Sequence, residues 1–482
     1  MMRMKIILLL ISFQCGLIGG FNYAIKIVEV DSGYTSDLVV EENNIVSLEV
    51  CNGKVYYAVV KDWRNPTIHR IVEVDPIGGD KRVVVEDYSV SSLKCIDGKL
   101  YGLMHRQEIG IASHYKLWVI SDKPECISCD LLDRNIYMIG GGYRGGVVVV
   151  YPDSGSSKLA IIYKDRVEDL VSGKVYVHQA CSNNNLIYYV LSTPTQPYEL
   201  YRYSGGGVEK ITSFNEWVVR ETKLYEPIKE SVVVENEEID GWIMLPGEGD
   251  KPYPLILYIH GGPKGMYGYM FHPEMQLMVS EGFAVAYANP RGSDGYSEEF
   301  VDIRGRYGVD DYKQLIIFLD HVVSKYSIDR DRLGVTGISY GGYLTNVMIT
   351  KTNRFKAAVS ENGIGDWIAD YWASDIGYWF DPDQIGGTPH NNLKEYIEKS
   401  PVYHVDNVET PVLFIHSMED YRCFIDQSLA MHVSLVMKNK ESRIVIFSKG
   451  SHGHSVYAEP RHRKKRYEIK LEWFREKLGK KP

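Results

Sequence analysis

A serine between two glycines is the pattern in this sequence with the clearest chemistry. It stands in Gly337-Ile338-Ser339-Tyr340-Gly341, after the apolar run 333–336 and before a helical run that reaches Thr350. This order of strand, tight turn and helix is what a nucleophile elbow requires. The turn excludes side chains at its glycine positions and leaves Ser339 strained and projecting above the strand ends. The pattern predicts that Ser339 is a nucleophile rather than an ordinary buried serine.

A serine hydroxyl needs a base to accept its proton, and the base needs a carboxylate to orient it. Acidic residues, Asp420 among them, follow an apolar run at 412–415, and His452 and His454 follow the next such run at 444–447. Asp420 comes 32 residues before His452, which gives the order serine, acid, histidine of α/β-hydrolases. Spacing alone does not choose between His452 and His454.

The oxyanion that forms when a serine attacks a carbonyl group needs two preorganised backbone donors. One expected donor is the N–H of Tyr340, directly after the nucleophile. The other should come from an early glycine loop, and His260-Gly261-Gly262-Pro263 follows the first strong strand, at 255–259. Glycine suits this task because it lets the backbone approach a substrate closely. The alternative is that 260–263 is a plain turn at the end of a strand.

The C-terminal part of the chain alternates strands with helices, which is the pattern of a parallel sheet with crossover helices. The predicted strands are six apolar runs at 255–259, 283–287, 333–336, 355–359, 412–415 and 444–447. Helical runs at 309–326 and 429–438 lie between some of them. We therefore predict an α/β-hydrolase domain over 221–482, with its boundary between 218 and 235.

The N-terminal part of the chain contains a repeat. Ile27-Val28-Glu29-Val30-Asp31 recurs as Ile71-Val72-Glu73-Val74-Asp75, at an offset of 44 residues. Polar turns that lead into apolar strands with tyrosine recur at 52–56, 97–101, 133–137 and 172–176. Short strands at a period near 40 are typical of four-stranded propeller blades. About 218 residues at ~44 per blade predict a reduced β-propeller of about five blades over 1–220.

The first 25 residues support two interpretations. A basic start followed by the uncharged stretch 6–25 resembles an export signal, although no A-x-A-like cleavage site follows it. In the register of the 44-residue repeat, however, Ile11-Ser12-Phe13 corresponds to the strand segment Val55-Tyr56-Tyr57. We therefore expect a strand of an incomplete first blade and a cytoplasmic protein, with export as the alternative.

Composition excludes several classes of protein. Hydrophobic residues make up 44% and charged residues 24% of the 482 residues, which excludes a disordered chain and a polytopic membrane protein. The net charge of −9 provides no electrostatic surface for nucleic acid. Cys126-Ile127-Ser128-Cys129 lacks the second pair that a zinc site needs, so we expect buried thiols, no metal and no cofactor. The basic run 461–466 is interpreted as the solvated face of the final helix.

Together these motifs resemble the prolyl oligopeptidase family of serine peptidases and, within it, the acylaminoacyl-peptidase branch. The matching segments are His260-Gly261-Gly262-Pro263, Asn289-Pro290-Arg291-Gly292-Ser293, Gly337-Ile338-Ser339-Tyr340-Gly341-Gly342-Tyr343, Ser400-Pro401, Asp420-Tyr421-Arg422 and Pro460-Arg461-His462-Arg463. The resemblance implies a propeller that caps a hydrolase. It also implies a triad of Ser339, Asp420 and His452, because the distance to Pro460 favours His452 over His454.

The resemblance implies three further roles. Gly262 and Tyr340 would supply the oxyanion N–H groups, and Arg422 would hold a substrate carbonyl rather than form a surface ion pair. Two departures concern the loop beneath the acid. Ser417 stands where the family usually has glycine, and Cys423-Phe424 replaces the usual Val-Pro. These departures bear on substrate preference more than on the triad.

The resemblance implies a serine exopeptidase that releases an N-acylated amino acid, or a short N-terminal unit, from small peptides. A dipeptidyl aminopeptidase would need an acidic pair to hold a free amine, for which Glu41-Glu42 and Glu237-Glu238 are candidates. The motifs also fit a carboxylesterase with the same triad, and a non-catalytic scaffold is the most distant interpretation. Because the family usually builds seven or eight blades, a reduced propeller either leaves a side entrance or needs a neighbouring subunit in a homo-oligomer.

Overall fold

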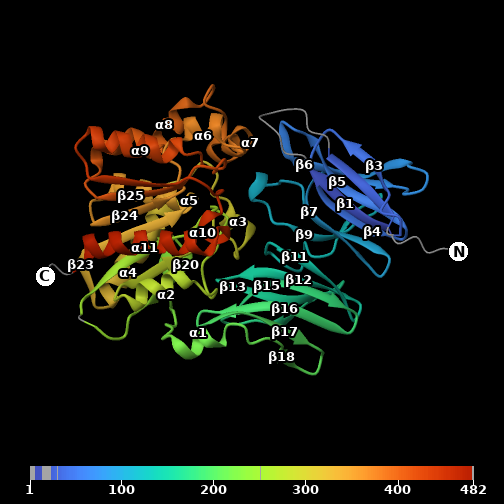
Figure 1. The fold of residues 1–482 in the computed structure, drawn as a ribbon, viewed down its shortest axis with the longest axis horizontal. Coiled ribbons are helices and arrows are strands. Elements are labelled where there is room, and N and C mark those ends of the chain that lie inside the picture. The colour runs from blue at the N-terminus through green and yellow to red at the C-terminus, as the bar shows by residue number, and fades with distance from the viewer. Residues whose placement is uncertain (1–5, 13–22, 30, 250, 480–482) are drawn as a thin grey trace.

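The computed structural model describes residues 6–12, 23–29, 31–249 and 251–479. Its N-terminal portion, blue to green in Figure 1, consists almost entirely of antiparallel strands, whereas the yellow-to-red portion alternates strands with helices. The predicted combination of a β-propeller with an α/β-hydrolase domain is confirmed. The predicted division at 220/221, where α1(Glu216–Glu221) lies, stays a prediction.

Five strand units follow one another along the described N-terminal portion, in agreement with the predicted number of blades. The first unit is a three-stranded sheet of β1(Ile6–Ser12), β2(Tyr23–Glu29) and β3(Thr35–Glu41). Ile6–Ser12 is therefore a strand, as predicted for this apolar segment. Phe13 and the remainder of 13–22 lie outside the described residues.

The second and third units share one bent strand. Residues 81–88 of β7(Lys81–Ile96) pair with β6, and residues 89–96 pair with β8. The other strands of these two units are β4(Ile45–Cys51), β5(Lys54–Asp62), β6(Asn65–Val74), β8(Lys99–His105), β9(Lys116–Val119) and β10(Glu125–Cys126).

The fourth and fifth units have four strands each and meet at a single parallel pair, Ser157 with Tyr176. Their strands are β11(Met138–Tyr143), β12(Gly146–Asp153), β13(Ser156–Ile162), β14(Val167–Val171), β15(Tyr176–Asn183), β16(Leu186–Thr193), β17(Gln196–Tyr203) and β18(Val208–Lys210). Buried aliphatic side chains fill the spaces between neighbouring units, which holds the blades together through the hydrophobic effect.

Two of the four predicted turns open hairpins. Asn52-Gly53 joins β4 to β5 and Asp97-Gly98 joins β7 to β8, all at positive φ, which Asn, Asp and Gly tolerate best. The other two, at 133–137 and 172–176, are loops that enter β11 and β15, the first strands of the next units. Each predicted turn therefore leads into a strand, but only half of them form hairpins.

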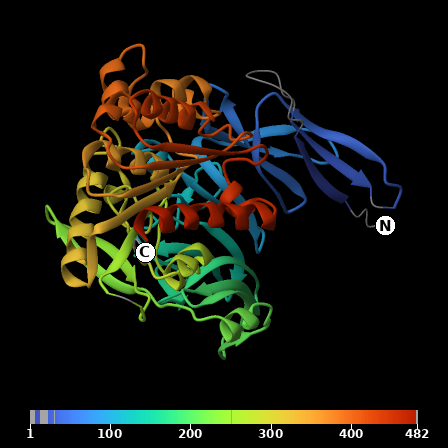
Figure 2. The same ribbon diagram turned by 60° about the vertical axis from the view of Figure 1, so that its left-hand side comes forward.

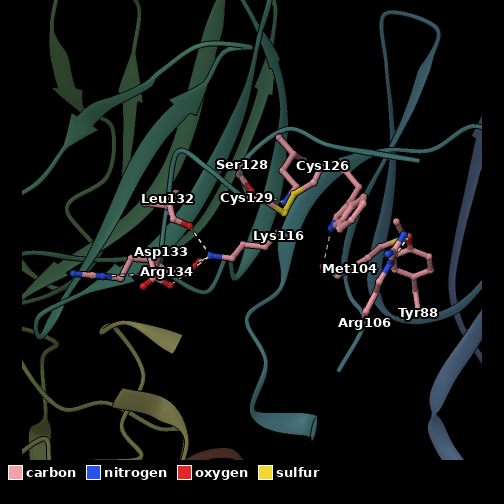
Figure 3. The surroundings of a disulfide bond; sticks show 12 residues. Tyr88, Met104, Arg106, Lys116, Cys126, Ser128, Cys129, Leu132, Asp133 and Arg134 are labelled. Carbon is pink, nitrogen blue, oxygen red and sulfur yellow. Dashed lines mark hydrogen bonds and ion pairs between the residues drawn. A yellow bond between two sulfur atoms is a disulfide. The ribbon is translucent and has the colours of Figure 1, made fainter. Parts of the chain in front are cut away.

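The described part of the propeller contains two disulfide bonds, so the expectation of buried thiols is wrong for four cysteines. Cys51 at the end of β4 is bonded to Cys95 in β7, and Cys126 is bonded to Cys129. Figure 3 shows the second bond, whose short loop also carries Ser128, the acceptor for a backbone N–H of β9. Disulfides are typical of oxidising compartments and of intracellular proteins from hyperthermophiles, so the predicted location in the cytoplasm stays a prediction.

The second portion of the chain is built on one eight-stranded sheet. The strand order is β19-β20-β22-β21-β23-β24-β25-β26, with antiparallel pairing as far as β22 and parallel pairing beyond it. All six predicted strands are present, as β21(Tyr253–Ile259), β22(Ala284–Ala288), β23(Ile328–Ile338), β24(Ala357–Glu361), β25(Val412–Ser417) and β26(Ser442–Phe447). The antiparallel pair β19(Ile228–Val234) and β20(Glu237–Met244) was not predicted; β19 is an edge strand with alternating exposure, and β20 lies between β19 and β22 and is mostly buried.

Helices cover both faces of this sheet. The helices α4(Asp310–Lys325), α5(Tyr340–Lys351) and α9(Asp426–Met437) bury their apolar residues on one face, and α2(Pro273–Ser280) and α11(Pro460–Leu478) on the other. In Figure 2 the red α11 lies across the second face. The remaining helices are η1(Gly110–Ala112), α3(Glu298–Val301), α6(Trp367–Ala373), α7(Gly377–Asp381), η2(Pro382–Gly386), α8(Leu393–Lys399), η3(Pro401–Asn407) and α10(His454–Tyr457). Among the described residues, no helix combines the length and the apolar character that crossing a bilayer requires.

Candidate active site

Ser339 lies at the sharp turn between β23 and α5. Its backbone adopts φ 60° and ψ −124°, a conformation that costs energy for any residue with a side chain. The flanking glycines make the turn sterically feasible. A Cβ atom at Gly337 would lie 2.4 Å from the backbone of Gly341, and a Cβ atom at Gly341 would lie 2.1 Å from the carbonyl oxygen of Ile259. The predicted nucleophile elbow is therefore present in the fold.

The structure brings Ser339, His452 and Asp420 together in one hydrogen-bonded chain. The Oγ atom of Ser339 lies 2.8 Å from Nε2 of His452, and Nδ1 of His452 lies 2.8 Å from Oδ2 of Asp420. Asp420 is fully buried, and its other oxygen, Oδ1, accepts the backbone N–H groups of Arg422 at 2.9 Å and Cys423 at 3.1 Å. A carboxylate satisfied in this way is held in one orientation and can orient the imidazole.

His454, the other candidate base, is bonded to a residue other than the serine. Its Nδ1 lies 3.0 Å from Nη1 of the buried Arg466. Burial and the adjacent guanidinium charge lower the pKa of His454 to about 4. The structure therefore places His452 next to Ser339 and gives His454 a different partner.

The predicted oxyanion residues Gly262 and Tyr340 belong to two segments that adjoin the serine. A Cβ atom at Gly261 would lie 3.3 Å from Cβ of Ser339, so the glycine loop directly adjoins the serine. Gly262 adopts φ 127°, and a Cβ atom there would lie 2.4 Å from the backbone of Lys264; only glycine suits this conformation. Tyr340 is the first residue of α5, and N–H groups at a helix start have no acceptor within the helix.

A buried acid, Asp311, and a half-buried lysine, Lys264, both outside the predicted set, support these loops. The hydroxyl of Tyr340 donates to Oδ2 of Asp311 at 2.5 Å, and burial raises the pKa of Asp311 to about 6. Lys264 follows the glycine loop, and its ammonium group donates to the propeller carbonyls of Ala112 at 2.9 Å and Ser113 at 2.8 Å. The propeller thus anchors the glycine loop. Neither contact was predicted, since both partners lie far away in the sequence.

Arg422 forms a two-point ion pair, which is the alternative considered for it from the sequence, although its partner Asp375 was not predicted. Its Nε lies 2.7 Å from Oδ1 and its Nη2 lies 3.2 Å from Oδ2 of Asp375. Both side chains remain partly exposed. Within the described part of the chain, no group of three or more His, Cys, Asp or Glu side chains is arranged to hold a metal ion.

The sequence and the fold of this chain match those of known proteins. Residues 269–481 match the prolyl oligopeptidase family. A solved structure, the uncomplexed acylaminoacyl peptidase of Pyrococcus horikoshii, is 33% identical with a TM-score of 0.89, over 96% of this chain and 75% of that one. The chain belongs to the prolyl oligopeptidase family. The family match includes Ser339, Asp420, Arg422 and His452.

Curated relatives match a smaller share of their own length. The uncharacterized peptidase YuxL of Bacillus subtilis is 38% identical over 349 residues, which are 69% of this chain and 52% of that protein. Dipeptidyl-peptidase 5 of Schizosaccharomyces pombe is 30% identical over 222 residues, 44% of this chain and 32% of that protein. The chain thus spans about half the length, or less, of these curated relatives.

The interpretation of 461–466 as a solvated helix face is wrong for Arg466. This side chain is fully buried, and so is Lys470 one turn later. Arg466, Lys470 and Phe474 are spaced by four residues, which places them on one face of a helix, and that face packs on the sheet. The four-residue spacing with Phe474 could have predicted that Arg466 is buried. The run was interpreted as exposed because it is basic.

Arg466 connects the loops that carry the triad in this member of the prolyl oligopeptidase family. It donates through Nε to Glu361 at 2.8 Å, and through its terminal nitrogens to Asn362 and Ser417 at 3.3 Å each. Ser417, the predicted departure from the family glycine, is thus a hydrogen-bond acceptor. Asn362 in turn donates to the carbonyl of His452 at 3.3 Å. One buried guanidinium therefore joins the ends of β24 and β25 to the histidine loop.

We expect Glu361→Gln to destabilise the protein by about 3 kcal/mol, because it leaves Arg466 and Lys470 buried with one anion fewer. Burial alone would raise the pKa of Glu361, but Lys470 and Arg466 lower it to about 2. Because the pKa of Glu361 is lower in the folded than in the unfolded protein, its ionised carboxylate stabilises the fold above about pH 4.3. This stabilisation is lost as the pH falls toward 2 and the carboxylate takes up a proton. The difference from wild type, measured by urea unfolding, should therefore be largest at neutral pH and shrink below pH 4.

Glu476→Gln is the matched control, because Glu476 forms an exposed two-point pair with Arg443. Exposed pairs contribute at most about 1 kcal/mol, so this variant should unfold close to wild type at every pH. If Glu361→Gln and Glu476→Gln were equally stable, the buried ion pairs of Glu361 with Arg466 and Lys470 would not have the stabilising role given to them here.

Proposed function

We propose that this protein is a serine exopeptidase that cleaves short peptides through an acyl-enzyme. Ser339 is the nucleophile, His452 the general base and Asp420 the orienting carboxylate. The observation that carries the proposal is the continuous hydrogen-bonded chain from Asp420 through His452 to Ser339 at a strained turn. The domains remain those predicted, a propeller over 1–220 and a hydrolase over 221–482.

The geometry translates into a sequence of proton transfers. Asp420 accepts a hydrogen bond from the Nδ1–H group of His452, which keeps Nε2 unprotonated and able to accept the hydroxyl proton as Oγ of Ser339 attacks the scissile carbonyl. The N–H groups of Tyr340 and Gly262 stabilise the oxyanion. His452 then gives its proton to the leaving amine. A water molecule, deprotonated by the same histidine, hydrolyses the ester and restores the serine.

The preferred substrate in this proposal is a short peptide with an N-acylated first residue. The support is the likeness to an acylaminoacyl peptidase at 33% identity over 96% of this chain. Arg422, two residues after Asp420, holds a carbonyl oxygen on the acyl side of the scissile bond. The proposal includes a restriction to small substrates by the propeller, which is bonded to the glycine loop through Lys264. Esters should be cleaved by the same triad.

A dipeptidyl aminopeptidase is the second candidate, since relatives named dipeptidyl-peptidase 5 are 27–30% identical. That activity needs free acids for a substrate amine. Glu41 is already bonded to Tyr57 and paired with Arg70 and Lys81, and Glu237 is paired with Arg291. One member of each predicted pair is therefore already engaged by other side chains, which favours the acylated substrate.

The test compares three substrates that share one chromogenic leaving group. They are an N-acetylated amino acid anilide, a free-amine dipeptide anilide, and a simple acyl ester. We expect the acetylated substrate to have the highest kcat/KM of the two amides, and the ester to be hydrolysed as well. A higher kcat/KM on the free-amine dipeptide would support the second candidate. The Ser339→Ala variant, assayed in parallel, corrects for contaminating hydrolases.

A further inference from the structure

The pair between Arg422 and Asp375 joins the catalytic loop to the segment between α6 and α7. Besides its two side-chain bonds, Asp375 donates its backbone N–H to the carbonyl of Tyr421 at 2.8 Å. The hydroxyl of Ser374 donates to the carbonyl of Arg422 at 2.6 Å. Residues 374–375 and 421–422 thus lie side by side and are bonded through both backbone and side chains.

The ion pair itself adds little to stability. The side chains of Arg422 and Asp375 are 44% and 46% exposed, and exposed pairs contribute about 0–1 kcal/mol. Two parallel bonds do, however, fix the plane of the guanidinium. They occupy Nε and Nη2, while in the described structure no acceptor is bonded to Nη1. The pair therefore orients Arg422 and leaves one nitrogen available to a ligand.

The segment that carries Asp375 is held by the propeller. The hydroxyl of Tyr378 in α7 donates to the carbonyl of Trp63, at the tip of the β5–β6 hairpin, at 3.1 Å. The backbone N–H of Ile111 donates to Asp383 at 3.3 Å. Figure 1 shows α7 on the side of the α/β portion that faces the first blades. The position of Asp375 is thus set from both portions of the molecule.

Other acidic side chains lie near the same guanidinium. Asp420 lies near enough for its charge to act on Arg422, and the charge of Arg422 reaches the buried Asp370. A guanidinium released from Asp375 would be drawn toward Asp420 and would lose the orientation that the two parallel bonds to Asp375 give it. The partner of Arg422 therefore decides where its free nitrogen points.

We propose that Asp375 is a positioning residue that holds the Arg422 guanidinium in the orientation that binds the substrate carbonyl. This inference rests on the function proposed above, in which Arg422 contacts that carbonyl. It adds that the propeller, by holding α7 through Trp63 and Tyr378, takes part in setting substrate affinity. Asp375 acts through Arg422 and does not touch the reacting atoms.

The test measures the kinetics of Asp375→Asn on two substrates. The N-acetylated anilide carries an acetyl carbonyl for Arg422 to bind, whereas a simple acyl ester has only the carbonyl that reacts. We expect KM for the anilide to rise about tenfold, the order of one misaligned charge-assisted hydrogen bond. The kcat should change little, because the lost contact exists in both ground and transition states. KM for the ester should stay at the wild-type value. A wild-type KM for the anilide would overturn the inference.

A double-mutant cycle separates positioning from a merely structural role. Arg422→Ala should raise KM for the anilide, and adding Asp375→Asn to it should have no further effect. A further rise in the double variant would overturn the inference. If Arg422→Ala itself leaves KM unchanged, the carbonyl contact in the proposed function fails instead, so the two failures are distinguishable.

Two more variants control for folding and for charge. Asp375→Glu keeps the charge but moves the carboxylate by one methylene, so KM should lie between the wild-type and Asp375→Asn values. If Asp375→Asn does not fold, a wild-type KM for Asp375→Glu would overturn the inference. Glu476→Gln removes a similarly exposed two-point pair elsewhere and should leave both KM values unchanged.

Discussion

Replacing Ser339 with alanine should lower kcat on an N-acetylated chromogenic anilide by about 10⁴–10⁶-fold. The variant loses the nucleophile but keeps the oxyanion donors, so only the background catalysis of a bound substrate remains. Folding should not suffer, because alanine tolerates the space and the hydroxyl bonds only to His452. Initial rates and a thermal melt of both proteins measure the two effects.

A fluorophosphonate label provides an independent measurement of the same residue. Wild type should take up one label at Ser339 and lose activity in proportion, whereas Ser339→Ala should remain unlabelled. Ser280→Ala is the matched control, since Ser280 is an exposed serine at the end of α2, and it should behave as wild type. Unlabelled wild-type protein would favour the non-catalytic scaffold, and activity in Ser339→Ala would contradict the mechanism.

Replacing Asp420 with asparagine should lower kcat by about 10⁴-fold with little change in KM. Oδ1 accepts the backbone N–H groups of Arg422 and Cys423, so the amide oxygen of asparagine must take that position. Its NH₂ group then faces Nδ1 of His452 and donates to it. The imidazole proton is forced onto Nε2, and the histidine can no longer accept the proton of Ser339.

Asp406→Asn is the control for this prediction, because Asp406 is an exposed aspartate paired only with Lys438. It should keep wild-type kcat. The Asp420 variant should keep its fold, as circular dichroism and a thermal melt would show. A kcat within tenfold of wild type in folded Asp420→Asn would mean that this carboxylate does not orient the base.

Much of the hydrolase portion was predictable because its determinants are local. The six apolar runs became the six expected strands, and the glycines around Ser339 produced the expected turn. The carboxyl ends of parallel strands meet at one edge of a sheet, so the loops after β25 and β26 had to approach the serine. The period of the N-terminal repeats likewise predicted the five strand units.

Contacts between distant segments were not predictable in the same way. Asp375 and Arg422 are 47 residues apart, and Glu361 and Arg466 are 105 residues apart. No periodicity connects such pairs, because their meeting depends on how whole loops and helices pack. The Cys51–Cys95 bond joins neighbouring blades at a separation of 44 residues, close to the repeat length, but the register of the blades had to be known first.

The two histidines after β26 show which part of the site the local sequence determines and which part depends on contacts between distant segments. The sequence by itself determined that the base for Ser339 and Asp420 is a histidine that follows this strand. The order of the strands brings the loop after β26 to these two residues. The sequence did not determine which histidine is the base, since residues 452 and 454 lie on the same short loop. Only the tertiary structure decided this, because the buried Arg466 of α11 binds His454 and leaves His452 to face the serine.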